Sequence, residues 1–143
     1  MACPYFYPLH RHPAKSQALL LPLPLGDAWT GLCHAPPGPP REPDAVVLDS
    51  ICSLGYARGR CERFRNDDPG PDAVRFTISQ TSEASLDVHY VLERDHHPFA
   101  NGRLRYLLSP RRGCKELAGQ TLARQADAYI ESYFGRRAAA AGF

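Results

Sequence analysis

Hydrophobic and polar residues alternate most regularly in the second half of the chain. The alternation covers residues 74–78, 86–92 and 104–108, each with apolar side chains at every second position. A period of two is typical of a strand that buries one face. The stretch 95–102 is polar and contains Asn-Gly, so it is expected to be a loop. The pattern therefore predicts a three-stranded antiparallel sheet over about residues 74–108.

A helical pattern follows these strands. Between Lys115 and Phe134, apolar or small residues recur at spacings of three and four. This is the stripe of an amphipathic helix that packs on a core. Gly135 is expected to end the helix, because glycine commonly follows the last helical turn. The helix, about residues 114–134, would cover one face of the sheet, and the predicted fold class is α+β.

The first part of the chain is less periodic and rich in proline. Most of the 14 prolines lie before residue 44, which excludes a long regular helix there. Residues 1–16 are expected to be irregular. Two short strands, 17–22 and 28–33, are predicted to form a hairpin. Residues 35–43 are expected to form a polyproline-like linker.

A short helix is predicted over about residues 45–54. Asp44 is placed to cap its N-terminus, and Gly55 can take the left-handed conformation that follows a helix. Its buried face is expected to contain three apolar residues at helical spacing, which are Val47, Ile51 and Leu54.

Length and composition fit one domain spanning residues 1–143. Hydrophobic residues make up 43% of the chain, which is enough for a core. Within this domain, residues 1–65 form a cysteine-bearing part that would bind a metal or cluster. Residues 74–135 form a sheet–helix part.

Charge and hydropathy predict neither a membrane-spanning segment nor a large basic surface that would bind nucleic acid. The net charge is only +2, from 17 basic and 15 acidic residues. The longest apolar run, residues 18–25, is interrupted by prolines and is far shorter than the roughly 20 residues that span a bilayer. No basic leader with an apolar core is visible near the start. We therefore expect a cytoplasmic protein without a membrane partner.

Four of the five cysteines, Cys3, Cys33, Cys52 and Cys61, lie in the first 61 residues. Cytoplasmic thiols are normally reduced, so this number favours metal ligation or redox chemistry over disulfides. Four thiolates can hold a tetrahedral zinc ion or an iron–sulfur cluster. These four cysteines are the predicted cofactor-binding and metal-binding residues.

The spacing of these cysteines helps to distinguish a zinc site from an iron–sulfur site. No C-x2-4-C pair, the usual zinc knuckle, is present. The dispersed arrangement resembles the cluster sites of several iron–sulfur proteins, including some nucleic-acid enzymes. The prediction is therefore a small protein with a [4Fe–4S] cluster. Its expected role is electron transfer with a protein redox partner, redox sensing or structural support.

Arginines surround Cys61 at Arg58, Arg60, Arg63 and Arg65. Their positive charge is expected to favour the thiolate and to offset the charge of a cluster. The same stretch, which includes aromatic residues, is also a candidate for contacts with phosphates and bases.

Other interpretations stay open at the level of sequence. A zinc-stabilised interaction module would use the same four cysteines, helped by His34. A metal-free α+β binding domain would use them as small buried residues. Cys114 is expected to be packed or incidental, and His89 to be a surface residue. No known catalytic motif is present, so no catalytic residue is predicted.

Overall fold

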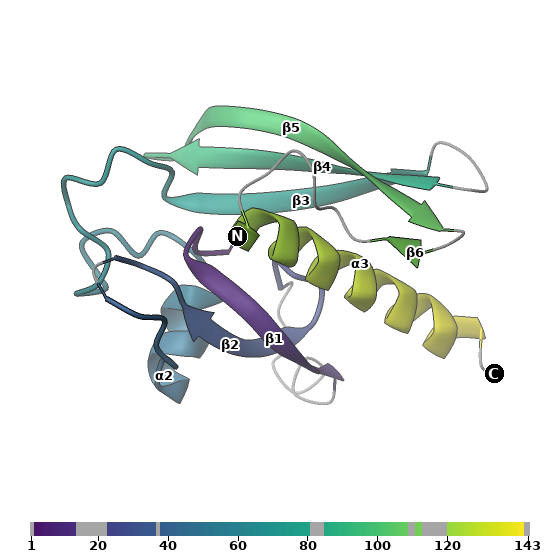
Figure 1. The fold of residues 1–143 in the computed structure, drawn as a ribbon, viewed down its shortest axis with the longest axis horizontal. Helices are drawn as coiled ribbons and strands as arrows, with labels where there is room; N and C mark the ends of the chain where they lie inside the picture. The colour runs from purple at the N-terminus through teal and green to yellow at the C-terminus, as the bar shows by residue number, and fades with distance from the viewer. Residues whose placement is uncertain are drawn as a thin grey trace.

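The computed structural model of the protein describes residues 2–13, 23–36, 38–80, 85–108, 111–112 and 120–141. The strand predicted over residues 17–22 lies outside these ranges, and so does Cys114. Figure 1 shows three layers, in which the long helix α3 (Gln120–Ala141) lies between a four-stranded sheet and a two-stranded ribbon. The α+β class is confirmed.

The larger sheet contains the three predicted strands. β3 (Ala73–Gln80), β4 (Ser85–Arg94) and β5 (His97–Leu108) pair antiparallel in that order. The short strand β6 (Arg111–Arg112) extends the sheet beyond β5. The alternation predicted these strands correctly, although burial alternates along β3 but not along β4, which buries both faces near its start, where Asp87 is fully buried.

The prediction of a loop over residues 95–102 is wrong. β4 and β5 are joined by a two-residue turn at Asp95 and His96, and β5 begins at His97. Both turn residues have positive φ, 51° and 62°, as the tight turns that match strand twist require. Asp-His is an uncommon choice for this turn, so the sequence did not predict it.

α3 covers one face of the sheet and also contacts the ribbon. Toward the sheet, the rings of Tyr129 and Phe76 lie 5.7 Å apart and nearly parallel. Toward the ribbon, the Trp29 indole N–H donates to Ser132 Oγ at 3.0 Å. The predicted helix is confirmed from Gln120 onward, and its predicted first residues lie outside the described ranges.

Gly135 does not end this helix, which continues to Ala141. A Cβ at this position would lie 2.1 Å from the guanidinium of Arg11, so the glycine makes room for that side chain. Arg11 in turn pairs with Asp27 at 2.6 Å. The residues after Gly135 are arginines and alanines, which favour a helix.

The ribbon pairs β1 (Phe6–His12) with β2 (Ala28–Cys33). The prediction that residues 1–16 are irregular is therefore wrong for β1. Pro8 lies within this strand, and the register shifts between Pro8 and His10. Proline is tolerated in edge strands and at bulges, where no ladder hydrogen bond is lost.

The predicted short helix is present as α2 (Ala45–Val47) followed by one π-helical segment, η1 (Leu48–Cys52). The N-cap prediction is confirmed, because the Val47 N–H donates to Asp44 Oδ1 at 2.9 Å. Gly55 follows with φ of 76°, as expected for a residue after a helix end.

The buried face of this helix differs from the prediction. Leu48 and Cys52 are buried, Val47 and Ile51 are partly buried, and Leu54 is exposed. A π-helical turn is wider than an α-helical one and rotates the following residues around the axis. The wider turn thereby places Cys52 on the inner side.

The segment predicted as a linker folds back onto the ribbon. Arg41 forms an isolated antiparallel bridge with Cys33, at 2.7 and 3.0 Å. A polyproline linker would leave its backbone in water. The bridge instead fixes the chain that leaves β2.

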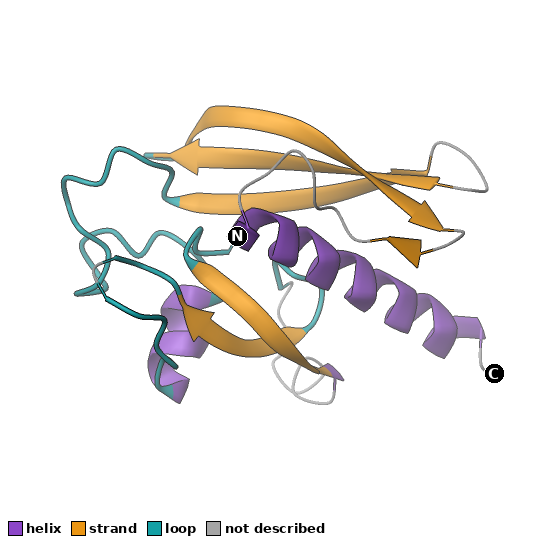
Figure 2. Cartoon of the chain, viewed as in Figure 1, coloured by secondary structure: helices purple, strands orange, loops and turns teal. Residues whose placement is uncertain are grey.

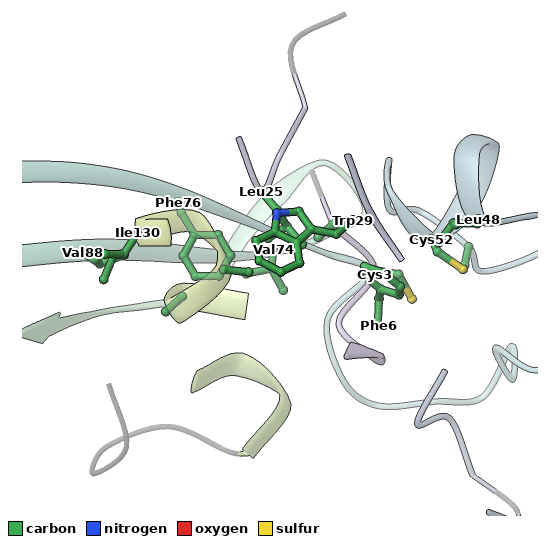
Figure 3. Packing of buried hydrophobic residues seen from close by; sticks show 14 of the residues in the cluster. Cys3, Phe6, Leu25, Trp29, Leu48, Cys52, Val74, Phe76, Val88 and Ile130 are labelled. Carbon is green, nitrogen blue, oxygen red and sulfur yellow. The ribbon is translucent and has the colours of Figure 1, made fainter. Parts of the chain in front are cut away.

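One buried hydrophobic cluster contains residues of both halves of the chain (Figure 3). Cys3, Phe6 and Trp29 from the first half belong to the same cluster as Val74 and Ile130. Among the described residues, no helix has the length and apolar character needed to cross a membrane. Figure 2 shows that the long loops gather at the end of the molecule that carries α2.

Candidate metal centre

Each of the four predicted cysteines comes from a different segment. Cys3 precedes β1, Cys33 ends β2, Cys52 ends η1 and Cys61 lies in the loop before β3. All four are free thiols. Burial, with smaller contributions from the thiols of Cys52, Cys33 and Cys61, raises the pKa of Cys3 to about 12. The fold places Cys33, Cys52 and Cys61 on the wall of one cavity, and Cys3 is hydrogen-bonded to Cys52.

Cys3 and Cys52 form what we call the inner pair. The Cys3 N–H donates to the Cys52 carbonyl at 3.0 Å. Both residues are only 6% exposed, and Figure 3 shows them at one end of the buried cluster beside Phe6 and Leu48. This hydrogen bond holds two cysteines from distant segments of the chain next to each other.

Gln125 of α3 holds the segment of Cys3 in place. Its side chain is fully buried and donates to the carbonyls of Cys3, at 2.8 Å, and Phe6, at 2.7 Å. Its own Oε1 has no hydrogen-bond partner in the described structure. The sequence analysis missed this residue, since a glutamine within a helical stripe gives only a weak signal.

Cys33 and Cys61 form the outer pair, and both are partly exposed. Arg63, two residues after Cys61, reaches the segment that follows β2. Its guanidinium donates to the Ala35 carbonyl at 2.6 Å and makes a longer contact of 3.4 Å with the Cys33 carbonyl. One side chain thus joins the two outer segments.

A cavity of about 410 Å³ opens beside these thiols. Cys33, Cys52 and Cys61 line it, whereas Cys3 is not among the described residues on its wall. Val47 supplies part of the apolar wall. The charged residues of the wall are balanced in sign and comprise Arg41, Glu42, Asp44, Arg60, Glu62 and Arg63.

The thiols of the inner pair are protonated when no metal is bound. Burial raises the pKa of Cys52 to about 12, as it does for Cys3, and the thiols of Cys33 and Cys61 add to the shift. Metal ligation requires the thiolate, so binding must displace these protons.

Two of the four arginines predicted to support the site are engaged elsewhere. Arg58 pairs with Asp72 at 2.7 Å and donates to three or more loop carbonyls, among them those of Asn66 and Asp68. Arg65 pairs with Asp67 at 3.0 Å. Arg58 therefore shapes the loop after Cys61, and only Arg60 and Arg63 lie on the cavity wall.

The histidine considered as an extra ligand is also engaged. The ring of His34 stacks on Tyr7, with centroids 4.7 Å apart. His89 contacts Ser79 at 3.0 Å on the sheet, far from the cysteines in the sequence. The role predicted for Cys114 falls outside the described residues.

The described side chains around the cysteines are not arranged about a single metal ion. Within the described ranges, no group of three or more His, Cys, Asp or Glu side chains could hold a metal ion as those side chains stand. The thiols are nevertheless close enough to perturb one another electrostatically. Cys33, Cys52 and Cys61 share the cavity, and Cys3 adjoins the segment of Cys52, but the described side chains do not form a single-ion coordination sphere. Comparison of the chain with protein-family models, with curated proteins and with solved structures finds no match.

Proposed function

We propose that this protein binds an iron–sulfur cluster, of the [4Fe–4S] type, through Cys3, Cys33, Cys52 and Cys61. The observation that supports the proposal is that three of these cysteines, from three separate segments, line one cavity, and that Cys3 is hydrogen-bonded to the backbone of Cys52. Free cysteines that serve only as small core residues have no reason to gather. The cavity gives a bound group a place.

The dimensions of the site favour a cluster over a single ion. A water molecule occupies about 30 Å³ in the liquid, so a cavity of about 410 Å³ holds a group of several atoms. Thiolate sulfurs lie roughly 6–7 Å apart around a cubane cluster but only about 3.5–4 Å apart around zinc. A cavity of this size, with three of the thiols on its wall, suits the larger group.

The chain's own residues would hold and shield this group. The inner pair anchors it on the buried side, and Val47 and Ile51 give the cavity an apolar wall. The guanidinium groups of Arg60 and Arg63 offset the negative charge that four thiolates impose. When bound, the cluster supplies one-electron chemistry or cross-links the segments, which fits electron transfer, redox sensing or structural support.

Elemental analysis of the full chain, purified without oxygen, tests the proposal. We expect about four iron and four sulfide per chain after reconstitution, with a broad visible absorption band. One zinc per chain without iron would support the zinc-stabilised module instead. Neither metal after reconstitution would support a metal-free domain.

A further inference from the structure

The two pairs of thiols differ in how deeply the fold buries them. The inner pair is buried, joined by a backbone hydrogen bond, and tied to α3 through Gln125. The outer pair is partly exposed and lies on the cavity wall. Bound metal would therefore have one closed side and one open side.

We propose that the site is loaded and emptied through the outer pair, and that Arg63 sets the rate. This inference rests on the proposed function and concerns its regulation. A chelator or small thiol in the cavity reaches Cys33 and Cys61 first. Cys3 is reached only after the outer ligands have separated.

Arg63 is a positioning residue in this scheme. It donates to the carbonyls of Ala35 and Cys33, and it follows Cys61 by two residues. When this side chain is present, the outer segments move together. When it is absent, Cys33 keeps its strand pairing with β1 and its bridge with Arg41, but the contacts described above include no other side chain that joins it to the segment of Cys61. Separation of the outer ligands then becomes easier.

Cys52 also lines the cavity, but it is only 6% exposed, and Cys3 is not among the described lining residues. Separation of Cys3 from Cys52 breaks their shared hydrogen bond and exposes buried Phe6 and Leu48. Exposure of two apolar side chains costs more than the loss of one exposed hydrogen bond. The order of release follows from this difference.

The first experiment uses the reduced, metal-free full chain and iodoacetamide, with each modified cysteine identified by mass spectrometry. We expect Cys33 and Cys61 to react roughly tenfold or more faster than Cys3 and Cys52, because the outer thiols are accessible and less desolvated. Equal rates for all four, or faster reaction of the inner pair, would overturn the inference.

The second experiment measures iron release from the reconstituted protein to a chelator. Arg63→Ala should release iron roughly fivefold faster, the kinetic equivalent of one lost hydrogen bond. Arg63→Lys, which cannot reach both carbonyls at once, should fall between Arg63→Ala and the native protein. Arg65→Ala is the matched control, since Arg65 pairs only with exposed Asp67 in the contacts described above.

The outcomes separate this inference from the proposed function. A native protein that takes up no iron contradicts the proposed function. The order in which iodoacetamide modifies the four cysteines still tests whether Cys33 and Cys61 are the more accessible pair. Iron uptake with equal release from Arg63→Ala and Arg65→Ala contradicts the role of Arg63. Unfolding measurements show whether Arg63→Ala is folded. If it is not, the rate of iron release from Arg63→Lys, compared with that of the native protein, tests the role of Arg63.

Discussion

The Asp72 carboxylate shows at the scale of one residue how the loop after Cys61 is held. Arg58 donates to one of its oxygens at 2.7 Å, and the Asp95 N–H donates to the other at 2.9 Å. Burial alone would raise the pKa of Asp72, but these hydrogen bonds outweigh it and hold the pKa below the ordinary 3.8. The charged form is thus the one that the fold stabilises.

Replacement of Asp72 should change the acid stability of the protein. The folded pKa lies below the unfolded one, so the stabilisation is present above about pH 3.8 and is lost as pH falls through the folded pKa. Asp72→Asn should lower the free energy of unfolding at neutral pH by about 1–3 kcal/mol and flatten its decline in acid. Asp67→Asn removes an exposed ion pair with Arg65. It should change neither the free energy of unfolding at neutral pH nor its decline in acid, as measured by denaturant titrations at several pH values. An unchanged acid profile for Asp72→Asn would refute this assignment.

Gln125 gives a second prediction at this scale. Gln125→Met keeps the volume but removes two buried donors, so the free energy of unfolding should fall by about 1–3 kcal/mol. Glu131→Gln on the exposed side of the same helix should change it little. Chemical denaturation measures both. Equal stability of Gln125→Met and the native protein would show that the side chain does not hold Cys3.

At the scale of elements, the α2–η1 helix determines where Cys52 lies. Its first turn depends on the Asp44 cap. Asp44→Ala should lower the free energy of unfolding by about 1 kcal/mol, whereas Asp44→Asn, which keeps a capping oxygen, should retain most of the stability. Thermal unfolding of both variants tests this. An equal loss in both variants would mean that the charge of Asp44, and not its cap, matters.

Elements with a strong periodicity of hydrophobic residues could be predicted from the sequence, and elements that depend on tertiary contacts could not. β3 and β4 follow from alternation, and the Asp44 cap follows from a local side-chain hydrogen bond. β1 was missed because Pro8 argues against a strand unless a bulge accommodates it. The helix continues past Gly135 because arginines and alanines follow, and the glycine stands there because Arg11 occupies the space that a side chain would take.

At the scale of the whole molecule, the sequence singled out four cysteines but not how the fold arranges them. Three of them line one cavity, and Cys3 is hydrogen-bonded to Cys52. The pairing of Cys3 with Cys52 depends on a hydrogen bond between segments that no local pattern encodes. The joining of the outer pair by Arg63 depends likewise on the path of the chain after β2.

The proposed cluster should make the stability of the whole molecule depend on metal. Binding free energy at a site that exists only in the folded state becomes folding free energy. Removal of the metal by a chelator should therefore lower the unfolding temperature of the native protein. The Cys52→Ser/Cys61→Ser double variant should be insensitive to the chelator, and a similar response of both proteins would argue against a bound metal.

The most direct measurement is the iron and sulfide content of the anaerobically reconstituted full chain beside that double variant, with Cys114→Ser as the control. The account predicts about four iron and four sulfide per chain for the native protein and for Cys114→Ser, and almost none for the double variant. Absence of iron from the native protein, or equal iron in all three proteins, would contradict it.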